Sequence, residues 1–137
     1  MSVDPSVLNR WNRCGWYRLT GLEVLDAGPD GSRFRMTVGA EHLQAYGTAH
    51  GGSVAGLLDA AMGLAIIAQL EPGEGCATIE MKVNFTAPVV PGQVTAHGEV
   101  ITLGRRVVVA RADAVNPDGR IAATALGTFS RFRDEGA

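Results

Sequence analysis

The sequence predicts an α+β domain in which an antiparallel sheet wraps around one long apolar helix. Apolar side chains recur at helical spacing through a nearly chargeless run over 54–70. Segments with alternating apolar and polar residues follow this run and are separated by glycine- and proline-rich turns. Apolar or small residues occupy nearly every side of the helix, which indicates that other elements surround it. The expected order is β-β-α-β-β-β-β in a single domain, residues 1–137.

Ahead of the central helix, the sequence predicts one short helix and two strands. Asp4-Pro5 is a helix start signal, so a short helix is expected over residues 6–11 of the N-terminal segment 1–16. The segments 17–28 and 31–40 read as strands joined by a Pro-Asp-Gly hairpin turn.

Glycine and proline mark both ends of the central helix. Gly51-Gly52-Ser53 is interpreted as a flexible lead-in with a possible N-cap, and Glu71-Pro72-Gly73 ends the helix. Four strand segments follow, over residues 77–88, 93–104, 105–115 and 120–132. In the first of these strands one face is expected to carry Ile79, Met81, Val83 and Phe85.

Composition excludes several classes of protein. Twelve basic and fourteen acidic residues give a net charge of −2, which does not indicate a nucleic-acid-binding protein. Cys14 and Cys76 have no metal-site spacing, so we expect neither a metal nor a disulfide, and a reducing compartment. The N-terminus has no apolar signal region, and the apolar run is short for a membrane span. We therefore expect a cytoplasmic protein that binds no membrane.

Asp59 lies inside the apolar helix, where an ionised carboxylate needs a partner or a task. Its neighbours one helical turn away are Ala55, Gly56, Met62 and Gly63, of which three are small. Glycine inside a helix costs about 1 kcal/mol relative to alanine and often has a packing or functional reason. The sequence thus predicts a depression beside Asp59 that is open to a ligand or a second chain, with room for an aryl or medium-chain group.

The His50-Gly51-Gly52 corner stands where the central helix begins. Backbone N–H groups of a first helical turn lack intrahelical partners and suit an oxygen that gains negative charge. His50 and Gln44 can add further donors. A carboxylate and an oxyanion site are the equipment for acyl transfer.

Helix geometry separates these two parts within one chain. Asp59 follows Gly51 by eight residues, roughly 12 Å along the helix axis. A two-fold dimer with antiparallel helices can bring Asp59 of one chain to Gly51 of the other. We therefore predict a composite site across a dimer interface.

The stretch 44–65, "QAYGTAHGGSVAGLLDAAMGLA", resembles the signature of hotdog-fold acyl-CoA thioesterases, in the branch that includes the phenylacetate-pathway (PaaI-like) type. The later segments "VNFTAPVVPG" and "GEVITLGRRVVVARADAVNPDGRIAATALGTF" match the same pattern, so the resemblance covers residues 17–132. It implies a homodimer with a continuous sheet, often a homotetramer made of two dimers. It also implies a hydrolase that cleaves a coenzyme A thioester without a cofactor, since coenzyme A is part of the substrate.

The resemblance also implies roles for individual residues. Asp59 corresponds to the catalytic carboxylate, as nucleophile or general base, and Gly51 to the N–H that polarises the thioester carbonyl. His50 corresponds to the residue that positions the thioester or assists the leaving thiolate. Gln44 falls where relatives carry an amide that orients the water or the carboxylate.

Five further positions are expected to contact substrate. Gly52 and Gly63 are placed beside the thioester, with Gly63 standing where several relatives carry serine or threonine. Met62 is interpreted as core packing first and a substrate contact second. Arg105 and Arg106 are candidates for the nucleotide phosphates.

Three other interpretations remain open from the sequence. An enoyl-CoA hydratase of this general fold needs an Asp–His pair in one loop, and no aspartate lies shortly before His50. A hotdog domain that binds acyl-CoA without cleaving it would not require Asp59. A purely structural dimer is the third.

Overall fold

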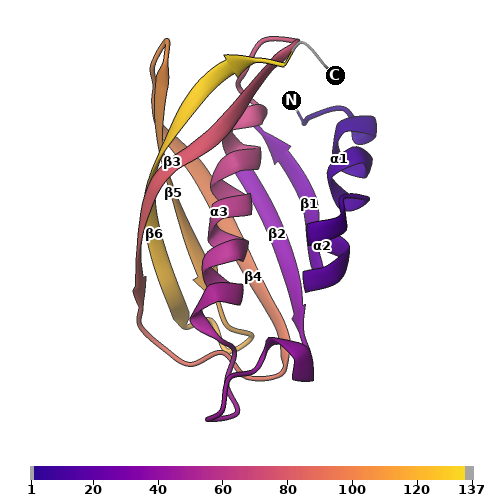
Figure 1. The fold of residues 1–137 in the computed structure, drawn as a ribbon, viewed down its shortest axis with the longest axis vertical. Coiled ribbons are helices and arrows are strands. Elements are labelled where there is room, and N and C mark those ends of the chain that lie inside the picture. Colours follow the sequence, from indigo (N-terminus) through magenta and orange to yellow (C-terminus); the bar gives the residue numbers. More distant parts are fainter. Residues whose placement is uncertain (1, 135–137) are drawn as a thin grey trace.

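The helix predicted at the centre of the domain is α3 (Gly51–Ile67), and a six-stranded antiparallel sheet curves around it (Figure 1). The computed structural model describes residues 2–134. The sheet order is β1-β2-β4-β5-β6-β3. Its strands are β1 (Leu22–Gly28), β2 (Gly31–Val38), β3 (Glu74–Phe85), β4 (Gly92–Leu103), β5 (Val107–Val115) and β6 (Ile121–Arg133). The predicted fold class and element order are confirmed.

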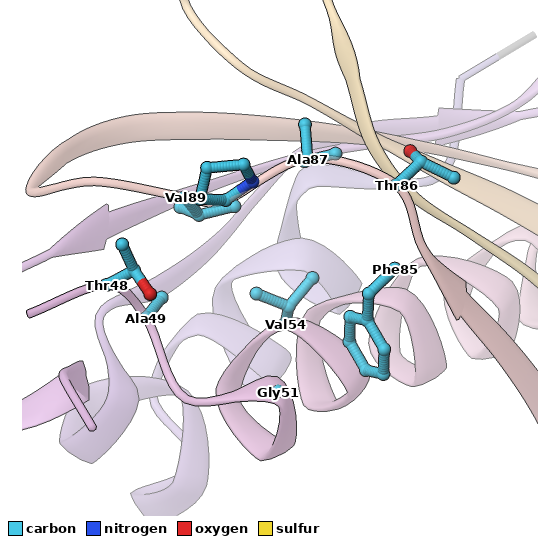
Figure 2. Close-up of a pocket in the computed structure, with 10 residues that line it drawn as sticks. Thr48, Ala49, Gly51, Val54, Phe85, Thr86, Ala87 and Val89 are labelled. Carbon is cyan, nitrogen blue, oxygen red and sulfur yellow. The ribbon is translucent and has the colours of Figure 1, made fainter. Parts of the chain in front are cut away.

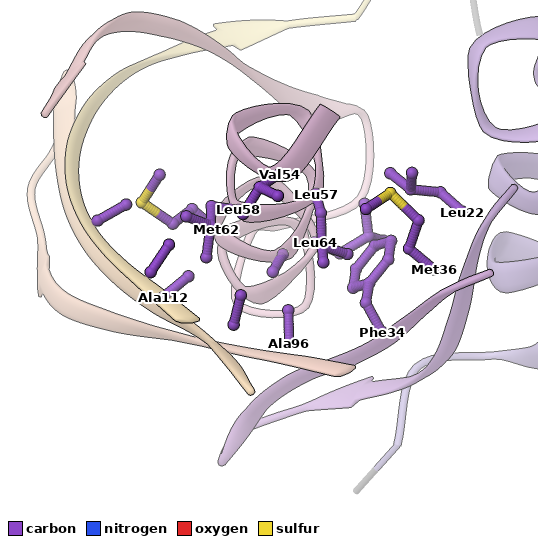
Figure 3. Packing of buried hydrophobic residues seen from close by; sticks show 14 of the residues in the cluster. Leu22, Phe34, Met36, Val54, Leu57, Leu58, Met62, Leu64, Ala96 and Ala112 are labelled. Carbon is purple, nitrogen blue, oxygen red and sulfur yellow. The ribbon is translucent and has the colours of Figure 1, made fainter. Parts of the chain in front are cut away.

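The core lies between α3 and the concave face of the sheet (Figure 3). Two residues fix the approach of the helix. Ser32 in β2 donates a buried hydrogen bond of 2.6 Å to the carbonyl oxygen of Ala61. Gly98 in β4 faces the same carbonyl so closely that any side chain there would overlap it. The fully buried helix residues are Leu57, Leu58, Ala61, Met62, Ala65 and Ile66.

The N-terminal segment forms two helices rather than one. In α1 (Pro5–Asn12) the Asp4 side chain caps the start by accepting the Ser6 N–H at 2.8 Å, as the sequence predicts. The strand expected from residue 17 is wrong over its first part, because Gly15–Thr20 forms α2. Gly21 ends α2 in the left-handed region at φ 71°, so the strand begins only at Leu22.

A buried tyrosine accounts for that difference. The Tyr17 ring packs edge-on to Phe34, at a centroid distance of 5.7 Å, and lies 6.0 Å from the ring of Trp11. Only 4% of Tyr17 is exposed. The contact with Phe34 is long-range, so local residue patterns do not reveal it.

The two outer strands differ in how their edges are covered. Along β1, the Asn12 side chain bonds both the N–H and the carbonyl of Val24, at 2.8 and 3.1 Å, and Val3 donates to Ala27 at 2.6 Å. At the other end of the sheet, β3 pairs only with β6 among residues 2–134. The covered β1 edge is closed to further pairing, whereas the β3 edge can accept another strand.

The apolar face predicted for β3 is only partly buried. A register shift between Thr78 and Glu80 interrupts the alternation, and Ile79 is 57% exposed. Phe85 at the far end is 55% exposed, and only Met81 and Val83 are half-buried. The predicted alternation is therefore interrupted at Ile79, where the register shifts, and Phe85 stays largely exposed although its ring lies over Gly51 of α3.

Within residues 2–134, none of the helices has the length and apolarity needed to span a membrane. This finding agrees with the interpretation of 54–70 as a core helix. The cellular location stays a prediction from sequence.

Candidate functional site

The start of α3 is capped by His50, not by the residues after it. His50 Nδ1 accepts the Gly52 N–H at 2.8 Å, and the Ser53 hydroxyl donates to the His50 carbonyl at 2.7 Å. The sequence placed 51–53 ahead of the helix, whereas these residues form its first turn. An accepting Nδ1 puts the ring proton on Nε2, so the exposed edge of His50 is a donor.

Gly51 and Gly52 differ in what their N–H groups can do. The Gly52 N–H is engaged by His50. Gly51 is the first helical residue, whose N–H has no intrahelical acceptor. The Phe85 ring lies over Gly51, 3.1 Å from where a Cβ would stand. Gly51, Val54 and Phe85 border a cleft of about 510 Å³ (Figure 2). Of the glycine pair, Gly51 can thus act as the oxyanion donor.

Gln44 holds the loop that precedes the helix. Its Nε2 donates to the Thr48 hydroxyl at 2.6 Å, and its Oε1 accepts the Tyr46 N–H. The main chains of Gln44 and Thr48 are also bonded, at 2.9 Å. Both ends of the Gln44 amide are therefore used in shaping the loop. These contacts do not give Gln44 the expected role of orienting a water molecule.

Asp59 lies two turns into α3 and is half-buried. Its Oδ1 accepts a hydrogen bond of 2.6 Å from the Thr78 hydroxyl in β3. The carboxylate lines a pocket of about 260 Å³, whose helix side includes the small residues Gly56, Ala60 and Gly63 beside the larger Leu64 and Ile67. No atom lies within 4 Å of a Cβ placed on Gly63. The predicted depression beside Asp59 is present in the structure.

Thr78 is the residue of this site that the sequence did not reveal. It lies nineteen positions from Asp59 and is one polar residue among several in β3. The only signal was indirect, since Gly63 lacks the hydroxyl that several relatives carry one turn after the carboxylate. The structure supplies a hydroxyl from the facing strand.

The two N-terminal helices form the outer wall of the Asp59 pocket. Trp11 contributes from α1, and Trp16 and Tyr17 from α2. The Trp16 ring lies 3.3 Å from the position of a Cβ on Gly56. Burial, with smaller contributions from Cys14 and the Asp59 carboxylate, raises the pKa of Tyr17 above its ordinary value. Tyr17 is therefore a neutral wall residue.

Cys76 also lines this pocket, with its Sγ 3.7 Å from the Gly63 carbonyl. Burial, and next the nearby Asp59 carboxylate, raises the pKa of Cys76 to about 11. The thiol is thus protonated at neutral pH and is a poor nucleophile. In the part of the chain that the structure describes, both cysteines are free, as expected.

We expect Cys76 in the folded protein to resist alkylation by iodoacetamide at pH 8, because the thiolate is scarce there. Mass spectrometry of tryptic peptides, before and after unfolding in urea, measures this. Unfolding removes the burial that raises the pKa, so alkylation should then become fast. Rapid labelling of native Cys76 would contradict the assignment and reopen a thiol mechanism.

Met62 and the arginine pair do not line the Asp59 pocket. Met62 is fully buried, and its Sδ and Cε lie 3.1 Å from a Cβ placed on Gly127, so its assignment as a substrate contact is corrected to core packing. Arg105 and Arg106 are exposed in the turn between β4 and β5. That turn lies at the end of the sheet opposite His50 (Figure 1), so one chain does not bring the arginines to the helix start.

Replacing Met62 by alanine is expected to lower the free energy of unfolding by about 2–5 kcal/mol, because a buried side chain leaves a cavity. Chemical denaturation measures the change. The ligand affinity of the folded fraction should stay the same, and Met62→Leu should restore most of the stability. A large loss of affinity in Met62→Leu would return Met62 to the binding site.

Comparison with known proteins agrees with the fold. A model described as the thioesterase superfamily matches residues 46–123. A Deinococcus radiodurans protein whose name carries a provisional esterase assignment is 33% identical over 132 residues, which cover 96% of this chain and 88% of the relative.

Two solved structures are similar over most of their length. A thioesterase from Haemophilus influenzae has a TM-score of 0.89 at 26% identity, covering 97% of this chain and 93% of that one. A mutant of the phenylacetic acid degradation protein PaaI from Thermus thermophilus has a TM-score of 0.79 at 28% identity, covering 87% and 100% of the two chains.

Proposed function

Given that this chain belongs to the thioesterase superfamily, with the hotdog fold, we propose that it hydrolyses an aryl- or medium-chain acyl-CoA to the free acid and CoA. The observation that carries the proposal is the Asp59 carboxylate, held by Thr78 at a pocket with apolar walls. The proposed reaction uses water and the chain's own groups, without a metal or prosthetic group.

The hydrogen bond to Thr78 favours a general-base route over nucleophilic attack by Asp59. Thr78 engages Oδ1, which leaves Oδ2 to accept a proton from water. The water oxygen attacks the thioester carbon, and the Gly51 N–H stabilises the oxyanion. When the C–S bond breaks, Asp59 returns the proton it took from water to the leaving thiolate, and the His50 Nε2–H can donate a hydrogen bond to the departing sulfur. Single-turnover hydrolysis in ¹⁸O-labelled water tests this route, because a nucleophilic Asp59 would transfer unlabelled carboxylate oxygen to the product.

The two halves of this machinery are proposed to meet across a homodimer. Asp59 contacts Thr78 near one end of β3, and Gly51 lies under Phe85 at the other end. Antiparallel pairing of two β3 edges about Met81 would set Thr78 of one chain near the partner's Phe85. The open β3 edge supports this arrangement.

A tetramer made of two such dimers is proposed on the ground of family resemblance. Exposed Ile101 and Leu126 supply apolar surface on β4 and β6 for a second dimer. We assign the nucleotide phosphates of CoA to Arg105 and Arg106. One chain alone does not bring these arginines to Gly51, so the assignment applies to the assembled protein.

Mixing two inactive variants tests the composite site. Co-expressed Asp59→Asn and Gly51→Pro chains should recover about a quarter of the wild-type activity, because half of the randomly paired dimers are mixed and each holds one intact site. Each variant expressed alone is the control. Mixed dimers without activity would show that each chain uses its own Asp59 and Gly51.

Replacing Thr78 by valine is expected to lower kcat/KM roughly 10- to 100-fold, because a hydrogen bond to a charged group contributes about 1.5–3 kcal/mol. Thiol release from acyl-CoA measures the loss. Thr78→Ser keeps the hydroxyl and should restore most of the rate, and Thr102→Val on exposed β4 is the matched control. Equal rates for Thr78→Val and wild type would remove Thr78 from the mechanism.

The alternative is a hotdog protein that binds acyl-CoA without cleaving it. Asp59 and the oriented Gly51 N–H favour hydrolysis, because binding alone requires neither group. Free-thiol release from aryl and straight-chain acyl-CoAs distinguishes the two. An acyl-CoA recovered intact after long incubation, with measurable affinity, would establish the binding protein instead.

A further inference from the structure

A second cavity adjoins the Asp59 pocket near the C-terminal end of α3. Trp11, Ile67 and Cys76 line both this pocket and the second cavity, which has a volume of about 510 Å³. We call the second cavity the upper cleft. Its further lining includes Val3, Val7, Leu70 and Phe132. The three shared residues form a junction between the two cavities.

The helix leaves a path open between Asp59 and the junction. Gly63 stands one turn after Asp59, and no atom lies within 4 Å of a Cβ placed there. Ile67 follows one turn later. Asp59 and Ile67 are eight residues apart, roughly 12 Å along the axis. Beyond Ile67 the upper cleft extends under α1.

Three of the four charged residues that line the upper cleft take part in ion pairs, and the fourth, Glu71, is exposed. Glu74 bonds Arg131 at 2.8 Å, and Arg10 lies 3.8 Å from Asp134. The remaining walls offer chiefly aliphatic and aromatic side chains, such as Val7 and Leu70. This lining suits an uncharged hydrocarbon.

We propose that the upper cleft binds the distal part of a straight acyl chain whose thioester lies at Asp59. The chain passes Gly63 and crosses the junction at Trp11, Ile67 and Cys76. This inference rests on the proposed function and selects among its substrates. A single aryl ring ends within the Asp59 pocket and leaves the upper cleft unfilled, whereas an octanoyl chain reaches the junction and a lauroyl chain extends into the upper cleft.

Chain-length profiles test the path. In wild type, kcat/KM should rise from acetyl- through butyryl- to octanoyl-CoA, by about three- to fourfold for each buried methylene. Ile67→Phe narrows the junction and should lower kcat/KM for octanoyl- and lauroyl-CoA by about tenfold or more, with butyryl-CoA unchanged. Val7→Phe lies further along the cleft and should affect lauroyl-CoA alone. Gln69→Phe, on the same helix end, is the control.

A flat chain-length profile, or an equal loss for butyryl- and lauroyl-CoA in Ile67→Phe, would overturn the proposal. Phenylacetyl-CoA should respond to Ile67→Phe as butyryl-CoA does, because its ring stops short of the junction. A loss for phenylacetyl-CoA as large as that for lauroyl-CoA would also count against the path.

A binding measurement separates this subsite from the hydrolytic function. The chain has two tryptophans, and both line the Asp59 pocket. In Trp16→Phe, lauric acid with a terminal bromine should quench the fluorescence of Trp11, and Ile67→Phe should weaken this binding about tenfold. If the fluorescence of Trp11 is not quenched, the proposed subsite is wrong, whether or not the protein cleaves thioesters. A second copy of the chain that covers the cleft would give this result. Quenching without hydrolysis would keep the subsite and reject the proposed function.

Discussion

Replacing Asp59 by asparagine is expected to lower kcat/KM for acyl-CoA hydrolysis by about a hundredfold or more, because the amide cannot accept the proton of the attacking water. The Thr78 hydroxyl can still donate to the amide oxygen, so the local structure should persist. Free-thiol release from a panel of aryl and straight-chain acyl-CoAs measures the effect. Asp30→Asn, in the exposed turn before β2, is the control.

Two results would overturn this expectation in different ways. Full activity in Asp59→Asn would make the aspartate a structural residue and the mechanism wrong. No turnover by the wild type across the panel would instead favour a protein that binds acyl-CoA without cleaving it. Thermal unfolding of both variants shows whether a loss of rate reflects a loss of fold.

Replacing Gly51 by proline should lower kcat by about 10²–10³-fold, the usual cost of removing one oxyanion donor. Proline is tolerated at the first helical position and removes only the N–H there. His50 has φ −59° and ψ 137°, an extended conformation compatible with a following proline. The fold should therefore survive the substitution.

Gly51→Ala is the matched control, because it adds a Cβ but keeps the N–H. Both variants press on the Phe85 ring, which is 55% exposed and has room to move. A large loss of kcat in Gly51→Pro, with only a small loss in Gly51→Ala, would assign the effect to the N–H. Equal losses would assign it to the displaced Phe85 ring and remove Gly51 as the donor.

Local signals were sufficient for most of the fold. Asp4-Pro5 marked the start of α1, and the alternation in β2 and the turns between later strands predicted the succession of strands along the chain, although not the pairing of β2 with β4 or of β3 with β6. The apolar surface all round α3 predicted that the sheet would enclose it. These signals are local because each depends on neighbouring residues. They are the periodicity of side chains, the N–H group that proline lacks and the conformations of turns.

The misassigned elements depend on contacts between distant residues. Tyr17 is helical because its ring packs on Phe34, which no neighbouring residue encodes. Residues 51–53 are a local exception, because they join the helix when the neighbouring His50 takes the capping position. Ile79 is exposed because a register shift interrupts β3 beside the uncovered edge.

The sequence by itself determined the fold class, the family resemblance and the candidates Asp59 and Gly51, because their spacing along one helix can be read from residue order. Tertiary structure decided what surrounds them. It assigned Thr78 to Asp59, placed Met62 in the core and set the upper cleft beside the Asp59 pocket. These features depend on how the curved sheet and the N-terminal helices approach α3, which residue order does not specify because the contacting positions lie far apart in the chain.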